Sequence, residues 1–580
     1  MSHSAIVPIV SSTNNRGHVE QDESQDLADQ LGDAHLNILP TRKIIVCLAA
    51  LSLGLFTSFA DQTSITIALP AIAKDLDAQT TINWAGTASL LANCVCQVLF
   101  GRLADIFGRK NILLTSLGIL AVADLACGFA QTGVQFYIFR AFAGIGCGGT
   151  QSLTMVMLSD ICTLRQRGKY QGILGAQVGL GNGLGPFIMA AFVEHLSWRR
   201  FYNMMPPLIV AVMVTIFFFI DNKKNTSQLN DVLSRREKFM NIDYLGMLFS
   251  TASLTLLLVA LSGGGSTYAW NSPLIIAMFI VGGVCLIGFV IIEWKIPKLP
   301  MIPLSLFSRT SLSLILSSNF LYGMAYYGFI YYLPYYFQII RGLDSIHSSI
   351  LLLPLVLTQS IASMIGGYII SYIGHYKYIV LGGYGIWTLS CGLLFLFNRN
   401  TNFGVVCVVL FLMGIGVGWT FQPTMVAAQS QAKKSERAVV IGARNVLRSF
   451  GGAIGIAVAS LIVSNSLLKE INQQYVDPNS ILSHAYLRNL KTHIYSKIDT
   501  SSLDPAQVEV IRGMYMRSIS HFFYLCLPLI ALCFVSTIFV KDTGLHCIDE
   551  EPEKKKKKDK EAQMGENKSD TSSSAGSYRT

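Results

Sequence analysis

Two carboxylates lie inside stretches of sequence that otherwise suit a hydrocarbon environment. Asp61 interrupts GLFTSFADQTSITIALP (residues 54–70), and Asp124 interrupts VADLACGFA (residues 122–130). An ionised carboxylate at the centre of a bilayer costs roughly 2.5–3.5 kcal/mol, so such groups face a protein interior or a water-filled cavity. A desolvated carboxyl group can bind and release a proton, and in its charged form it can hold a cation. The pair predicts a site where protons and a cationic substrate compete; the alternative is that each aspartate only locks two helices together.

Arg140 is the cation best placed to join these acids. It lies near the start of another apolar stretch, FRAFAGIGCGG (residues 139–149). Arginine stays protonated, so within a membrane it needs carboxylate or carbonyl partners. If successive apolar stretches cross the membrane in alternating directions, Arg140 lies on the same side as Asp61 and Asp124, which favours pairing. The alternative is an interfacial arginine whose head group reaches water.

A third set of polar candidates consists of aromatic and amide side chains. In LYGMAYYGFIYYLPYYF (residues 321–337), Tyr322, Tyr326 and Phe329 fall at helical spacings on one face. That face could line a cavity and receive flat or cationic molecules by cation–π contact, or it could simply pack. Six amides inside apolar stretches could contact a substrate, although hydrogen bonding between helices is the simpler role for each: Gln97, Gln177, Asn182, Asn319, Gln359 and Gln422.

The composition indicates that a membrane positions these residues. Of 580 residues, 52% are hydrophobic and only 13% are charged, whereas soluble domains are about 25% charged. Apolar runs long enough to cross a bilayer as helices predict an all-α membrane protein with spans near 45–70, 82–101, 111–130, 135–158, 170–192, 202–221, 242–262, 273–293, 311–338, 347–372, 378–397, 403–424, 439–467 and 521–540.

The loops between the spans predict the orientation. Lysine and arginine concentrate in one set of connections, which the positive-inside rule assigns to the cytosol. The set includes GRLADIFGRK (residues 101–110) and the connection 222–241. With an even number of spans, both termini are then cytosolic, and 468–520 is expected to be a long loop on the opposite side. The charged, apolar-poor tails 1–42 and 542–580 are expected to be disordered.

Several functional classes find no support in the sequence. There is no cluster with metal-ligand spacing among the scattered cysteines and histidines, no nucleophile elbow and no phosphate-binding loop. We therefore expect no metal, no cofactor, no enzymatic activity and no nucleic-acid partner. The partners expected are a small-molecule substrate, protons and the lipid bilayer, for a protein that acts as a monomer.

A weak internal repeat supports a two-part transporter. Residues 367–377, GYIISYIGHYK, keep the glycine spacing of residues 101–110, with Gly367 and Gly374 in place of Gly101 and Gly108. The two segments occupy corresponding positions if the seventh and eighth spans are inserted between two bundles of six. Transporters of this kind consist of two such halves around a midplane site. The expected units are 43–221, the inserted pair 242–293, and 294–541.

Four motifs make the sequence resemble the major facilitator superfamily, in particular fungal fourteen-span drug:proton antiporters. They are the loop signature with Gly101, Asp105, Gly108, Arg109 and Lys110; a second motif with Arg140, Gly144 and Gly146; an antiporter motif with Gly181, Gly185 and Pro186; and DQTSITIALPAI in the first span, beginning at Asp61. Ala143 replaces the usual glutamine of the second motif. Met189 and Ala190 replace the glycine pair that usually closes the antiporter motif, which weakens the inference to antiport.

The resemblance implies a proton-coupled antiporter that exports small organic compounds, cationic or amphipathic, from the cytosol. Within it, Asp61, Asp124 and Arg140 are expected to carry the coupling, and the glycines of the fifth span are expected to form a rocking surface between the halves. A vacuolar basic amino acid transporter is the alternative in the same class, so the plasma membrane and the vacuolar membrane are both open. A non-transporting membrane sensor is the alternative from another class.

Overall fold

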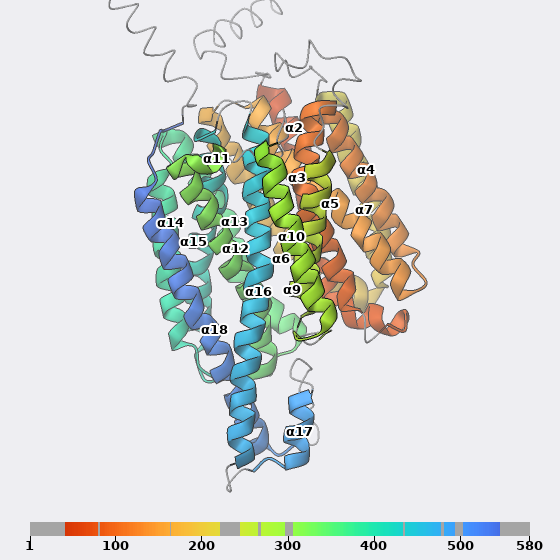
Figure 1. The fold of residues 1–580 in the computed structure, drawn as a ribbon, viewed down its shortest axis with the longest axis vertical. Coiled ribbons are helices and arrows are strands. Elements are labelled where there is room, and N and C mark those ends of the chain that lie inside the picture. The colour runs from red at the N-terminus through yellow and green to blue at the C-terminus, as the bar shows by residue number, and fades with distance from the viewer. Residues whose placement is uncertain are drawn as a thin grey trace, which may run out of the picture.

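The structure, a computed structural model, describes residues 41–78, 82–162, 164–220, 244–264, 268, 270–295, 305–432, 436–476, 481–492 and 503–545. The predicted tails, apart from a few residues at their inner ends, and the whole connection 222–241 lie outside this range. The described chain is almost entirely helical (Figure 1). Its α-helices are α2 (Thr41–Asp75), α3 (Asn83–Phe107), α4 (Arg109–Gly128), α5 (Gly133–Ile161), α6 (Leu164–His195), α7 (Trp198–Phe219), α9 (Tyr244–Gly263), α10 (Pro273–Lys295), α11 (Ser305–Ser308), α12 (Thr310–Tyr335), α13 (Ser345–Ile373), α14 (Lys377–Leu393), α15 (Phe403–Ser430), α16 (Arg437–Val476), α17 (His484–Thr492) and α18 (Pro505–Phe539).

The prediction of an all-α membrane protein is confirmed. Among the described helices, thirteen are long and apolar enough to cross a membrane. The remaining predicted span coincides with α12, in which serine, asparagine and tyrosine side chains lower the mean hydropathy. Each of the fourteen apolar runs therefore corresponds to a helix, as expected from the need to satisfy every backbone polar group within lipid.

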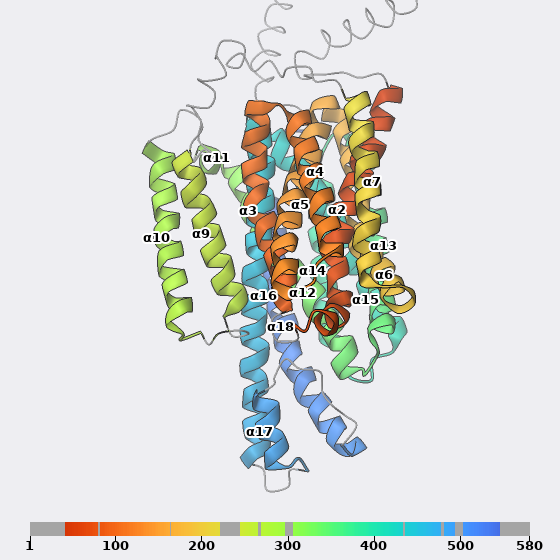
Figure 2. The same ribbon diagram turned by 90° about the vertical axis from the view of Figure 1, so that its right-hand side faces the viewer.

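The helices form two groups with an extra pair at the flank. Helices α2 to α7 pack on one another, as do α12 to α16 with α18, and the groups meet where α6 contacts α13 and α3 contacts α16. Helices α9 and α10 pack together at one side of the molecule, and α9 contacts α3 and α16 (Figure 2). We call the end where α2 begins and α18 ends the tail side, and the opposite end the α17 side.

The repeat seen in the sequence appears as the same device in both groups. Gly108 lies between α3 and α4 with φ 93°, and Gly374 follows α13 with φ 81°, a backbone region that favours glycine. Just beyond each turn a lysine reaches the last turn of another helix. Lys110 Nζ donates to the carbonyl oxygen of Phe217 in α7 (2.7 Å), and Lys377 Nζ donates to that of Ile538 in α18 (2.7 Å). A cation at a helix C-terminus is favourable, so each turn fastens a neighbouring helix within its own group.

The prediction that 468–520 is a long loop is wrong for much of its length. Helix α16 continues to Val476, α18 already begins at Pro505, and α17 lies between them. With 40 residues, α16 is about 60 Å long, twice the thickness of a bilayer core. Apolar side chains bury the facing sides of the extension, and Arg517 of α18 pairs with Glu470 of α16. The hydropathy scan missed these turns because the surface of the extension is polar.

Candidate functional site

The centre of the first group is a buried ion pair between α2 and α5. Arg140 Nη1 donates to both carboxylate oxygens of Asp61, at 2.7 and 2.8 Å, and both residues are 0% exposed. Arg140 also lies over the ring of Tyr202, and the thiol of Cys147 lies 3.8 Å from Asp61 Oδ2. The pairing agrees with the expectation drawn from the alternating direction of the spans. Arg140 is thus a fully buried partner and not an interfacial residue.

Glycines of the recognised motifs allow the helices to approach closely around this pair. A Cβ at Gly144 of α5 would overlap the carbonyl oxygen of Ser89 in α3, and one at Gly146 would lie 2.6 Å from the backbone nitrogen of Leu120 in α4. On α6, a Cβ at Gly185 would lie 2.7 Å from the carbonyl oxygen of Ala60, the residue before Asp61. The motif glycines therefore pack three helices against the backbone that carries the ion pair.

Asp124 of α4 completes a cluster of two acids and one base. It is 0% exposed, and neither carboxylate oxygen makes a hydrogen bond of ordinary geometry. Asp61 and Arg140 nevertheless lie close enough for their charges to act on Asp124. A single guanidinium can neutralise only one of two buried carboxylates, so the cluster becomes electrically neutral when it holds one proton. In chemical terms, two acids that share one base can bind and release a proton.

Gln97 belongs to a polar network that continues from the ion pair through the first group. Gln151 of α5 donates to Ser58 Oγ (3.2 Å) and Gln62 Oε1 (3.3 Å) of α2, which lie three residues before and one residue after Asp61. Gln97 of α3 donates to Asn93 (2.6 Å) and to Gln151 (3.4 Å). These bonds join α2, α3 and α5, which is the helix-to-helix role considered as the alternative for Gln97.

In the second group, the tyrosine face of α12 meets polar partners from both groups. The rings of Tyr322 and Tyr326 stack with centroids 5.5 Å apart, and Tyr322 meets Trp387 of α14 edge to face at 5.0 Å. Tyr326 donates to Gln359 of α13 (3.2 Å) and also interacts with Asn182 of α6. Tyr326, Gln359 and Asn182 therefore meet at the junction of the two groups.

The three remaining amides that were expected to contact a substrate, Gln422, Asn319 and Gln177, each have a different environment. Gln422 of α15 is fully buried with an amide that has no hydrogen-bond partner, and its side chain packs on Gly175 of α6. Asn319 is bonded within the second group, to the carbonyl of Ile315 and the hydroxyl of Thr424. Gln177 is half-buried on α6.

The structure separates Phe329 from the tyrosine face predicted to hold it. Phe329 stacks on Phe523 and contacts Phe522, both in α18, with centroids 5.8 and 5.9 Å apart. The residue therefore belongs to an aromatic packing layer inside the second group. One helical face extends over several turns, and its two ends meet different neighbours.

The fifth-span glycines also divide between two neighbours, which corrects the expectation of one rocking surface. Gly181 and Gly185 face α2, and Thr63 of α2 donates to the carbonyl of Gly181 (3.4 Å). The glycines on the opposite face meet α13 of the second group: Gly168, Gly172, Gly175, Gly179 and Gly183. Pro186 lies within α6 and is half-buried. Helix α6 thus connects the ion-pair turn to the junction of the groups.

In the loop signature, the structure describes the backbone of Gly101, Asp105 and Gly108, but not the side chain of Asp105. Gly108 supplies the turn and Lys110 the helix cap described above. Arg109 begins α4 and is half-buried.

Two arginines that the sequence reasoning passed over are buried in the second group. Arg444 and Arg448 of α16 are 1% and 4% exposed, and neither pairs with a carboxylate in the part of the chain that the structure describes. Both guanidinium groups lie over the ring of Phe421, at 5.1 and 4.9 Å. The signal was available, because two arginines four residues apart stand inside a predicted span.

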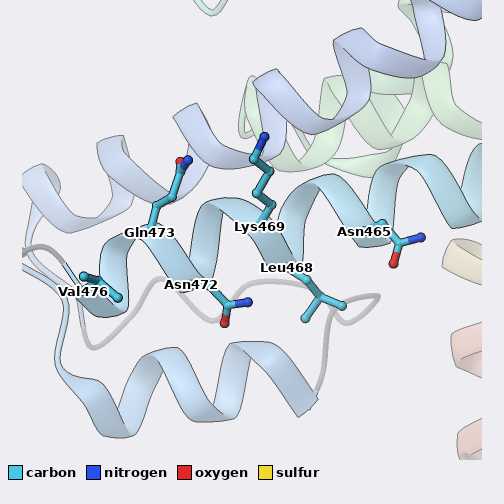
Figure 3. A pocket seen from close by; sticks show the side chains of 6 residues that line it. All are labelled: Asn465, Leu468, Lys469, Asn472, Gln473 and Val476. Carbon is cyan, nitrogen blue, oxygen red and sulfur yellow. The ribbon is translucent and has the colours of Figure 1, made fainter.

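A separate pocket lies outside these buried clusters. It has a volume of about 710 Å³ and is lined by residues of the C-terminal third of α16: Asn465, Leu468, Lys469, Asn472, Gln473 and Val476 (Figure 3). Its lining shares no residue with the clusters described above.

Comparison with known proteins identifies the family to which this fold belongs. A family model described as Major Facilitator Superfamily matches residues 51–456. The chain belongs to the major facilitator superfamily. A solved structure of the human organic anion transporter MFSD10 covers 85% of this chain and 100% of its own, with a TM-score of 0.54 and 14% identity, and so supports the fold alone.

Curated members of the superfamily show what similar fungal chains do. Citrate exporter 1 of Yarrowia lipolytica is 43% identical over 509 residues, which cover 88% of this chain and 74% of that protein. Efflux pump dotC of Dothistroma septosporum is 30% identical, covering 82% and 81% of the two chains. The vacuolar membrane amino acid uptake transporter fnx2 of Schizosaccharomyces pombe is 28% identical, covering 88% and 87%. The protein is accordingly a multi-pass membrane transporter of the major facilitator superfamily that acts on small molecules.

Proposed function

We propose that this transporter exchanges protons for a small organic compound and exports that compound from the cytosol. The observation that carries the proposal is Asp124, a fully buried carboxyl group beside the Asp61–Arg140 pair whose oxygens make no hydrogen bond of ordinary geometry. Two acids that compete for one guanidinium give the cluster two arrangements, which differ in the acid that is paired and the acid that is protonated. A proton can therefore bias the cluster between two states.

Helix α6 supplies a route from this cluster to the junction of the groups. One face packs on Ala60, next to Asp61, and the other packs on α13 backbone to backbone at Gly172 and Gly367. A change in the pairing of Asp61 alters the turn of α2 against which α6 rests. In this mechanism, protonation shifts α6 relative to α13, and the two groups rock around the polar residues between them.

The direction of transport follows from the proposed orientation. The tail side carries most of the basic loop residues, so we assign it to the cytosol. Asp61 lies 20 residues along α2, about 30 Å from the tail-side end, so the proton cluster lies nearer the α17 side. Protons then reach the cluster from the compartment opposite the cytosol. Antiport requires this direction, because the substrate leaves the cytosol while protons enter it.

The structure changes the argument about substrate charge. We expected Asp61 to attract a cation, but Arg140 already neutralises it. A cationic or amphipathic substrate now depends on Asp124 alone. The efflux pump among the relatives supports export but not a particular substrate charge. The second candidate, uptake of basic amino acids into the vacuole, has the support of the fnx2 relative. A sensor without transport activity has no such relative among those described here.

Reconstituted vesicles can separate these functions. The full chain is placed in proteoliposomes with an imposed pH gradient, and uptake of citrate, of arginine and lysine, and of an amphipathic dye cation is measured. Flux that a protonophore abolishes supports exchange, whereas flux that ignores the gradient contradicts it. A sensor should give no flux with any compound, and a tagged protein in cells shows whether the plasma membrane or the vacuole contains it.

The Asp124→Asn variant tests the proton site directly. Asparagine is nearly isosteric and removes only the titratable group, so we expect the thermal unfolding midpoint to stay close to that of the wild type. We expect gradient-driven flux to disappear while exchange of unlabelled for labelled substrate, without a gradient, persists. Asp77→Asn, at an exposed turn, is the matched control. Undiminished gradient-driven flux in Asp124→Asn would remove this residue from the coupling mechanism.

A further inference from the structure

We infer that Arg444 and Arg448, together with Tyr322, form a binding site for a small organic anion with two or more carboxylates. The inference rests on the proposed transport function and names the class of its substrate. The buried interior of the second group contains an imbalance of charge. Two guanidinium groups are buried on α16, and no carboxylate pairs with them in the described part of the chain. Buried cations without a counter-charge are costly, and in membrane proteins they mark a functional site.

The packing around the arginines holds them in place and leaves hydrogen-bonding capacity unused. A Cβ at Gly323 of α12 would overlap the carbonyl oxygen of Arg448, so α16 rests directly on α12 there. Arg444 donates to the Phe421 carbonyl and to Thr424 (3.0 Å) in α15. The side chain of Arg448 makes no hydrogen bond to any residue that the structure describes. Its guanidinium group lies over the rings of Tyr327 and Phe421, at 5.8 and 4.9 Å.

Unpartnered polar atoms lie beside the two cations. The Tyr322 hydroxyl is fully buried without a hydrogen bond, and the charges of both arginines act on it. The indole Nε1 of Trp387, whose ring contacts Tyr322, is also unpartnered. Polar groups that are buried without partners each cost free energy. A ligand that accepts hydrogen bonds would satisfy these donors at the same time as it neutralises the arginines.

The spacing favours more than one carboxylate. Residues four apart on a helix have Cβ atoms about 5–6 Å apart, and each planar guanidinium matches a carboxylate in a two-bond geometry. The charges of Arg444 and Arg448 repel each other, and an anion that bridges them removes that repulsion. The aromatic rings of Phe421, Trp387 and Tyr322 suit a carbon skeleton better than a bare inorganic anion. The citrate exporter among the relatives transports a compound of this chemistry.

The site is also well placed for loading from the cytosol. Arg444 lies seven residues into α16, about 10 Å from its tail-side end, whereas the acid cluster lies near the α17 side. Cys94 of α3 lies near Arg448 and Ser449, so the site borders the first group as well. A polycarboxylate bound here contacts the second group at a border that a rocking motion opens and closes.

Equilibrium binding tests this inference independently of proton coupling. Citrate, succinate, acetate, inorganic phosphate and lysine are titrated by calorimetry into the full chain in lipid nanodiscs, without a pH gradient. We expect citrate to bind most tightly, and Arg448→Gln to weaken its binding by at least about tenfold, the loss of one charged hydrogen-bonding partner. Arg517→Gln, which alters an exposed arginine on the extension, should leave citrate binding unchanged.

Two milder variants keep the test decisive if Arg448→Gln fails to fold. Arg448→Lys keeps the charge but loses the planar two-bond geometry, and Tyr322→Phe removes only the hydroxyl; both should weaken citrate binding. Tighter binding of phosphate or lysine than of citrate, or wild-type citrate affinity in these variants, would overturn the inference. Intact citrate binding together with flux that ignores the pH gradient would instead leave the anion site standing and refute the proton coupling.

Discussion

The Asp61→Asn variant is expected to reach its membrane and to show no proton-driven flux. The substitution removes the charge that neutralises Arg140 in a fully buried site. Breaking such a pair from one side costs about 3–5 kcal/mol when the remaining charge has no other partner. Asp124 is the other acid whose charge acts on Arg140, so we expect it to accept the arginine and to limit the loss of stability in the single variant.

This compensation gives the test its control. The full destabilisation should appear in Asp61→Asn with Asp124→Asn, and adding Arg140→Gln to that pair should restore much of the stability, because no buried charge then remains. Thermal unfolding of the purified chain measures stability, and vesicle flux measures coupling. Equal stability of the single and double variants would show that Asp124 does not exchange partners with Asp61, and wild-type flux in Asp61→Asn would remove Asp61 from the mechanism.

The second large effect is expected for Gly367→Leu at the junction of α6 and α13. A Cβ at Gly367 would already overlap the carbonyl oxygen of Gly168 and lie 2.8 Å from Cα of Gly172. Both obstacles are backbone, so the helices must separate, and overpacking of this kind costs typically 1–3 kcal/mol. We expect flux of every substrate to be lost, with or without a pH gradient, because the two groups can no longer close on the tail side.

Gly392→Leu in α14 is the matched control, since a Cβ there would meet nothing within 4 Å. Flux and the unfolding midpoint are compared for the two leucine variants in the same vesicles. A Gly367→Leu protein that folds and transports at the rate of Gly392→Leu would show that the close approach of α6 and α13 is not needed for transport.

The sequence was sufficient for the membrane architecture and for one long-range pairing. Hydropathy located all fourteen spans, and the alternating direction of the spans put Arg140 on the same side as Asp61, which favoured the ion pair that the structure shows. The glycine repeat around Gly108 and Gly374 was also visible. These features depend on local properties: the cost of moving each residue into lipid, and the direction in which each span must run.

Only the tertiary structure decided which neighbour each interior residue meets. Glycines of similar spacing on α6 contact α2 in one case and α13 in the other. Phe329 packs on aromatic residues of α18. The stretch 468–520 lengthens α16 and α18 beyond the thickness of a bilayer. The same holds for Arg444 and Arg448, with which no carboxylate of the described residues forms an ion pair. Hydropathy records the environment that a residue requires, but partners come from helices distant in sequence, so the balance of buried charge is settled only when those helices pack.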